Sequence, residues 1–160
     1  MKSNFFLPGI FTLNRGKGTR SIFAGALLLA TAFLFACSTI AIYDQVAYEH
    51  ATSAKVDTLA LMDKATGDYS VHEKEVAVVT LELDKAYEYD KGRPLNEITV
   101  KQWELLLSPD HDLVGGFLRD WKQKGSLRPV FIAEKKRQIG KAFDQIIQLE
   151  SGKLKPSQVQ

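Results

Sequence analysis

The chain has few of the residues that crosslink proteins or bind metals. Its 160 residues include one cysteine and three histidines. A single cysteine excludes an internal disulfide bond. No two of the histidines, His50, His72 and His111, are separated by the four residues that place a metal-binding pair on one helix face. A Gly-rich phosphate-binding loop is missing as well, so we predict neither a metal nor another cofactor.

The sequence also shows no pattern of catalytic carboxylates. Acid–base catalysis uses paired carboxylates in a cleft that separates their pKa values. The acidic residues here are spread over helical polar positions. They include Asp57 and Asp63, and a predicted solvated face formed by Glu82, Asp84, Glu88 and Asp90. We therefore predict no catalytic residues and a protein that is not an enzyme.

Charged residues are missing from positions 21–43, and this absence follows a basic start. The first 20 residues contain four bases, Lys2, Arg15, Lys17 and Arg20, and no acidic residue. A basic flank before an apolar run is typical of an export signal, because the flank stays on the cytoplasmic side while the run inserts. The remainder of the chain is expected on the far side of that membrane.

The uncharged run contains Leu34-Phe35-Ala36-Cys37, which resembles the lipobox of bacterial lipoprotein precursors. The resemblance implies that residues 1–36 are a signal peptide and that Cys37 becomes the acylated first residue. Ser38 follows the cysteine in place of the Asp that favours retention in the inner membrane. The resemblance therefore implies a periplasmic domain, held by lipid to the outer membrane rather than to the inner one.

An uncleaved signal anchor is the alternative to this lipid anchor. Residues 22–42 form 21 consecutive positions without a charge. About 20 apolar residues are enough to span a bilayer as a helix. Both readings place the following domain outside the cytoplasm, and they differ only in what holds it to the membrane.

Charge is distributed unevenly along the part of the chain that would remain after cleavage. Residues 37–112 contain 7 basic and 15 acidic residues, a net charge of −8, whereas residues 113–160 contain 10 basic and 4 acidic residues, a net charge of +6. In one domain this asymmetry predicts ion pairing between its halves. The basic cluster Lys135, Lys136, Arg137 and Lys141 fits that pairing better than contact with anionic lipid, and nucleic acid is not an expected partner.

Apolar residues recur at spacings of three and four and predict helices over 40–66, 70–90, a kinked 99–124 and 129–151. Two capping boxes, Ser70 to Glu73 and Thr99 to Gln102, mark expected helix starts. Ser108 and Pro109 are expected to restart the kinked segment. Short links favour antiparallel neighbours. The predicted fold is an all-α, up-down antiparallel four-helix bundle over residues 37–152, followed by a disordered tail at 153–160.

The predicted buried stripes are sets of apolar positions on each helix. The first helix is expected to bury Tyr43, Val46, Ala47, His50, Ala54, Leu61, Met62 and Ala65. The second is expected to bury Val76, Val79, Thr80, Leu83, Ala86 and Tyr87, and the last Ile132, Ile139, Ala142, Phe143, Ile146 and Leu149. Gly115 and Gly116 interrupt an apolar stripe, and we expect them to allow another backbone to approach closely.

Aromatic residues are concentrated in the kinked segment. Trp103, Phe117 and Trp121 are candidates for a partner-binding surface, although aromatic residues at helical spacing are more often core residues. The sequence thus predicts a membrane-anchored envelope protein with a binding, scaffolding or accessory role. Its expected partner is another envelope protein. The alternative is a carrier of a small apolar ligand or lipid, which would need a pocket between the helices.

Overall fold

The computed structural model describes residue 41 and residues 43–152, all of which lie in the unit Ser38–Gln160. The predictions for Cys37, for the signal segment and for the tail at 153–160 lie outside the described residues. Within the described part the fold is all-helical, without a strand. None of the helices in this part is long and apolar enough to cross a membrane.

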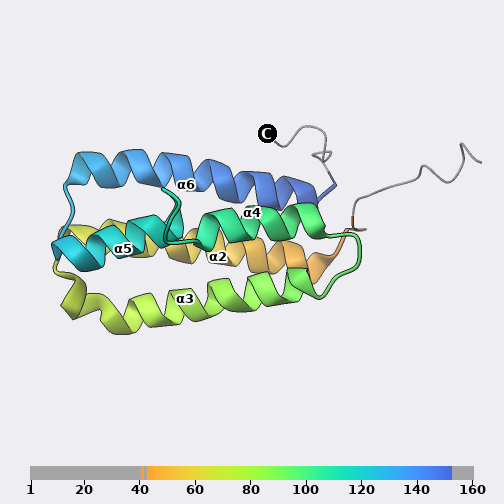
Figure 1. Ribbon diagram of the computed structural model, residues 1–160, viewed down its shortest axis with the longest axis horizontal. Coiled ribbons are helices and arrows are strands. Elements are labelled where there is room, and N and C mark those ends of the chain that lie inside the picture. Colours follow the sequence, from red (N-terminus) through yellow and green to blue (C-terminus); the bar gives the residue numbers. More distant parts are fainter. Residues whose placement is uncertain (1–40, 42, 153–160) are drawn as a thin grey trace, which may run out of the picture. The chain divides into compact units, whose positions relative to one another are not determined.

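Five α-helices and one 3-10 turn make up the described domain. They are α2 (Gln45–Asp63), η1 (Lys64–Thr66), α3 (Tyr69–Lys91), α4 (Glu97–Leu107), α5 (Val114–Lys124) and α6 (Pro129–Glu150). Helix α2 packs against α3 and α6, and α4 packs against the same two helices. Figure 1 shows the shorter α4 and α5 following one another along the three long helices.

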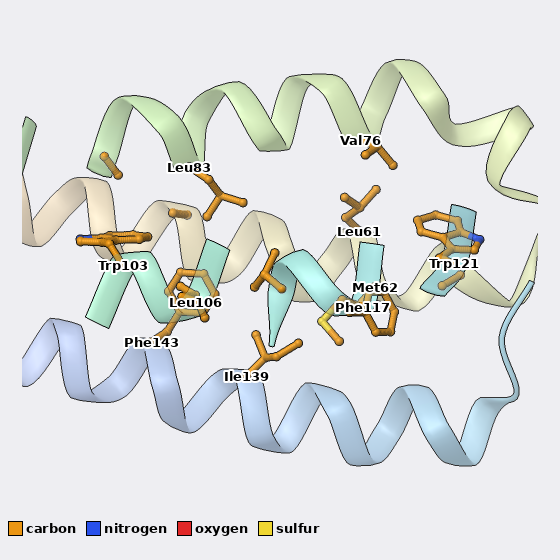
Figure 2. Close-up of a cluster of buried hydrophobic side chains, with 14 of the residues drawn as sticks. Leu61, Met62, Val76, Leu83, Trp103, Leu106, Phe117, Trp121, Ile139 and Phe143 are labelled. Atoms are coloured by element: carbon orange, nitrogen blue, oxygen red, sulfur yellow. The ribbon is translucent and has the colours of Figure 1, made fainter. Parts of the chain in front are cut away.

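The core lies between these helices and is formed by the stripes that face inward. Figure 2 shows its larger side chains, with Trp103 and Trp121 at opposite ends of the row. Five of the six stripe residues predicted for α6 are buried, namely Ile132, Ile139, Phe143, Ile146 and Leu149. The stripe of α3 is confirmed at Val76, Leu83 and Ala86, while Val78 and Leu81 are exposed off that face, as their spacing indicates.

Helix α2 begins later than the sequence predicted. Asp44 is its N-cap, and the carboxylate accepts a hydrogen bond of 2.9 Å from the amide of Ala47. Tyr43 therefore precedes the helix and does not continue its stripe. The prediction that Tyr43 and Val46 are buried is wrong, since they are 56% and 43% exposed. The rest of the stripe is buried at Ala47, Ala54, Leu61, Met62 and Ala65, and it also includes Ala51 and Thr58.

Both predicted capping boxes are wrong in position. The N-cap of α3 is Asp68, whose carboxylate accepts from the amide of Ser70, so Ser70 is already helical. The N-cap of α4 is Asn96, and its carbonyl accepts the first helical bond from Val100. Thr99 consequently lies inside the helix, where it is buried.

The predicted kink is a break, and the expected helix start at Pro109 is wrong. Ser108 ends α4, the amide of His111 bonds back to the carbonyl of Ser108, and α5 begins only at Val114. The glycines explain the geometry: a Cβ on Gly115 would overlap the carbonyl of Leu107, and one on Gly116 would overlap that of His111. The expected close backbone approach is thus present, and it comes from the chain's own connection.

Candidate functional site

The three aromatic residues predicted as a partner surface are core residues. Trp103, Phe117 and Trp121 are 0%, 2% and 0% exposed. Trp103 stacks edge-on against Phe143, and the indole of Trp121 donates a 3.0 Å hydrogen bond to the carbonyl of Gly67. Figure 2 shows all three side chains among the helices. A surface that meets a partner therefore has to be formed by other residues.

A buried charged cluster lies where the end of α3 meets the end of α6. Asp90 accepts a 2.6 Å hydrogen bond from the indole of Trp103 and a longer one, 3.3 Å, from Arg93. Arg93, in the loop between α3 and α4, also pairs with Glu150 of α6. The side chain of Asn96 donates to the backbone carbonyl of Asp90. These bonds tie the loop after α3 to the last turn of α6.

The pKa of Asp90 is raised to about 6, first because burial disfavours its charged form and then because Glu150 is negative nearby. The hydrogen bonds from Trp103 and Arg93 act in the opposite direction. A carboxyl of this pKa has the proton affinity that acid–base chemistry uses. The adjacent groove, lined by Arg93, Asn96 and Lys101 among others, includes neither Asp90 nor Glu150. We therefore interpret the cluster as a structural one.

The sequence interpretation of Asp90 as part of a solvated face is wrong, because its exposed fraction is 1%. The spacing does contain the signal that would have shown this. Asp90 follows the buried Leu83 and Ala86 at i+7 and i+4. Glu150 follows the buried Phe143 and Ile146 in the same way. Each carboxylate occupies the next position of an apolar stripe.

The histidines do not meet. His50 packs edge-on against Tyr89, and His72 lies against Trp121 and 3.6 Å from a carboxylate oxygen of Glu75. His111 is exposed in the connection between α4 and α5. Over residues 43–152 no group of three or more His, Cys, Asp or Glu side chains is placed to hold a metal ion.

An apolar groove runs between α2 and α3 on the outside of the domain. It has a volume of about 450 Å³, and its lining includes Ala60, Leu61, Val78 and Val79 with charged residues at the margin. Of these four apolar residues only Leu61 is buried, and Val78 is 61% exposed. The groove is therefore shallow, and it leaves apolar surface open to solvent.

Two of the four residues in the basic cluster on α6 form ion pairs within the domain. Lys136 contacts Asp63 at 2.5 Å and Lys135 contacts Asp112 at 3.1 Å. A further pair joins Lys55 of α2 to Asp144 of α6 at 2.5 Å. The predicted pairing between the acidic and basic halves is thus present at Lys135 and Lys136.

Comparisons of the chain with protein-family models, with curated proteins and with solved structures find no match. The function has to be argued from the domain's own surfaces.

Proposed function

We propose that this chain is a bacterial envelope lipoprotein with a binding or scaffolding role and no catalytic activity of its own. The observation that carries the binding role is the α2–α3 groove, which exposes apolar side chains on the outside of the domain. Residues 1–36 are its signal peptide, Cys37 its acylated residue, and the domain stands in the periplasm, preferentially at the outer membrane.

The proposed architecture is an up-down antiparallel four-helix bundle in which α4 and α5 together form the fourth rod. Its support is the packing of α2 and of α4 against both α3 and α6. The break between α4 and α5 takes the place of the predicted kink. Such a bundle gives a rigid body on which an exposed groove keeps its shape.

The proposed occupant of the groove is a segment of another envelope protein that is apolar on one side and cationic at its edges. Residues 45–91, which contain α2 and α3, have ten acidic and five basic residues, a net charge of −5. Asp57 at the groove margin is exposed and has no ion-pair partner among the described residues. Apolar side chains of a partner helix would enter between the two helices, with cations near Asp57.

A carrier of a small apolar ligand is the second candidate, and the same groove is what favours it. Its volume of about 450 Å³ is within the range of ligand pockets. Ligand pockets usually bury about 70–90% of the surface of their ligand, which requires a largely enclosed site. A groove with Val78 at its open edge covers a ligand on one side only. This geometry suits the surface of a protein segment better.

The test is photo-crosslinking in the native envelope. A photoreactive residue is placed at Val78, in the groove, and in a control protein at Val130, which is 81% exposed at the start of α6. We expect one discrete crosslinked protein from position 78, none from position 130, and loss of the product in an Asp57→Lys background. Equal capture from both positions, or capture of lipid alone at 78, would contradict the binding role.

The anchor is tested separately by mass spectrometry of the mature N-terminus. Acylation of Cys37 with loss of residues 1–36 supports the lipoprotein. An intact N-terminus that retains residues 22–42 supports the uncleaved signal anchor.

A further inference from the structure

We propose that the end of the domain formed by the start of α2 and the α3–α4 loop rests on the membrane surface, with Tyr43, Tyr48 and Leu95 in contact with lipid. This inference rests on the proposed membrane attachment and adds an orientation to it. A domain placed in this way holds its α2–α3 groove, which is lined by the second half of α2 and the first half of α3, away from the bilayer and open to a partner.

Leu95 is the first observation. It has a φ of 59°, the only positive φ at a non-glycine residue within 43–152, and its side chain is 51% exposed. The left-handed conformation costs a non-glycine residue roughly 1–2 kcal/mol. Asn96 beside it is buried and bonded to the carbonyl of Asp90, so the loop's conformation is held from within. An exposed apolar side chain at such a position contributes no burial energy to the stability of the domain in water.

The second observation is a pair of exposed tyrosines at the start of α2. The rings of Tyr43 and Tyr48 lie 6.4 Å apart, and they are 56% and 37% exposed. Val46 between them is also exposed. Tyrosine is enriched where proteins meet the membrane interface, since its ring is apolar and its hydroxyl remains hydrated.

These two apolar features lie at the same end of the domain. The hydroxyl of Tyr89, near the end of α3, donates to Asp44 at 3.1 Å, which joins that end to the start of α2. Arg93 and Glu150 join the loop after α3 to the end of α6. Figure 1 shows the α3–α4 loop and the start of α2 at one end of the helices.

The length of chain between the attachment point and this end argues for lipid as the occupant. Tyr43 lies six positions after Cys37, and an extended chain reaches at most about 3.6 Å per residue, roughly 20 Å in all. The uncleaved alternative, a span ending at residue 42, would bring Tyr43 closer still. Under either attachment this end is the part of the described domain that is held nearest the bilayer.

The opposite end supplies matched controls. Val71 and Val130 are 76% and 81% exposed, more than Leu95. They lie near the starts of α3 and α6. Backbone hydrogen bonds from Tyr69 to Gly125 and from Leu127 to Ala65 hold the connections at that end together. A contact driven only by exposed apolar surface would involve these valines equally, whereas a contact set by the attachment point would not.

The experiment uses the full chain, matured in its native membrane and reconstituted into phosphatidylcholine–phosphatidylethanolamine vesicles. Cys37 is the only cysteine, so once it is acylated a Leu95→Cys variant presents a single thiol for an environment-sensitive fluorophore. Val71→Cys and Val130→Cys are the controls. We expect quenching by brominated lipid to be at least about threefold stronger at position 95, and to fall by about half when Tyr43 and Tyr48 are changed to serine.

Equal quenching at positions 95, 71 and 130, or none at position 95, would overturn the membrane contact. Protection of position 95 in native membranes without quenching by lipid would assign the same end to a protein partner and would also overturn it. Mass spectrometry of Cys37 in the same samples reports on the anchor independently. A free Cys37 removes the lipid anchor from the proposal, and the labelling is then repeated in a Cys37→Ser background, where position 95 again carries the single thiol and its quenching decides the contact.

Discussion

Single residues in this domain show what a periodic pattern can and cannot predict. Asp90 and Glu150 are indistinguishable from surface carboxylates as residue types, yet both continue apolar stripes at i+4 and i+7 spacing. Arg93, three residues after Asp90, supplies the opposite charge. Recognising this cluster from sequence requires knowing that the ends of α3 and α6 meet, which depends on tertiary packing.

The buried Asp90 makes stability depend on pH in an unusual direction. Its folded-state pKa of about 6 exceeds the usual 3.8, so the folded protein binds this proton more tightly than the unfolded chain does. Its contribution is complete below pH 3.8 and is lost as the pH rises through about 6. A shift of this size corresponds to roughly 3 kcal/mol. Asp44, Asp68, Glu75 and Asp120 have lowered pKa values and oppose this trend only at lower pH.

We therefore expect Asp90→Asn to remove this dependence, because an amide is always neutral and can still accept from Trp103. Urea unfolding of the purified chain at pH 4, 5, 6 and 7 measures it. The difference in unfolding free energy between variant and unchanged protein should move in favour of the variant as the pH rises. Asp84→Asn, exposed on the same helix, is the control. Parallel pH curves for Asp90→Asn and the unchanged protein would contradict the prediction.

Leu95 allows a second prediction about one residue. Leu95→Gly relieves the left-handed strain but increases the freedom of the unfolded chain, so we expect a net stabilisation of up to about 1 kcal/mol. Thermal unfolding followed by circular dichroism measures it. The same variant should weaken the proposed lipid contact, which separates stability from membrane binding. A lower melting temperature for Leu95→Gly would show that the leucine side chain stabilises the loop.

The helices themselves could be predicted from sequence more closely than their ends. The predicted range 70–90 is one residue shorter than α3 at each end, and the predicted range 129–151 is one residue longer than α6 at its C-terminal end. The larger errors, at the starts of α2 and α5, have tertiary causes. Asp44 is the N-cap that also bonds Tyr89, and the connection before α5 packs on a glycine pair. Neither the bond between Asp44 and Tyr89 nor the approach of the connection to the glycines leaves a mark on local periodicity.

The glycine pair therefore yields a prediction about α5. Gly116→Leu, and the smaller Gly115→Ala, should destabilise the domain by about 1–3 kcal/mol or more, because any Cβ there meets backbone carbonyls. Gly140→Ala is the matched control, since a Cβ on Gly140 would meet only the side chain of Leu59, at 3.9 Å. Helix propensity favours alanine by up to about 1 kcal/mol there. Denaturant unfolding that ranked Gly115→Ala as mild as Gly140→Ala would contradict this account.

At the scale of the whole domain, the core determines how its two ends behave together. Buried apolar residues form one cluster that extends from Trp103 to Trp121. Ion pairs such as Lys136 to Asp63 add contacts across helices, but surface pairs contribute only about 0–1 kcal/mol each. The anchor and the partner, by contrast, involve segments and molecules outside this core, and no pattern inside it predicts them.

A continuous core predicts that the two ends unfold in one cooperative transition. Trp103→Phe leaves Trp121 as the reporter of one end, and Trp121→Phe leaves Trp103 as the reporter of the other. Either substitution lowers stability, since each indole donates a hydrogen bond inside the core. Within each variant, however, tryptophan fluorescence and far-UV circular dichroism should give the same urea midpoint. If fluorescence of Trp103 changed at a lower urea concentration than helix content, the end near Asp90 would be unfolding on its own. The charged cluster would then act as a separate local unit, and the orientation proposed for that end would depend on its state.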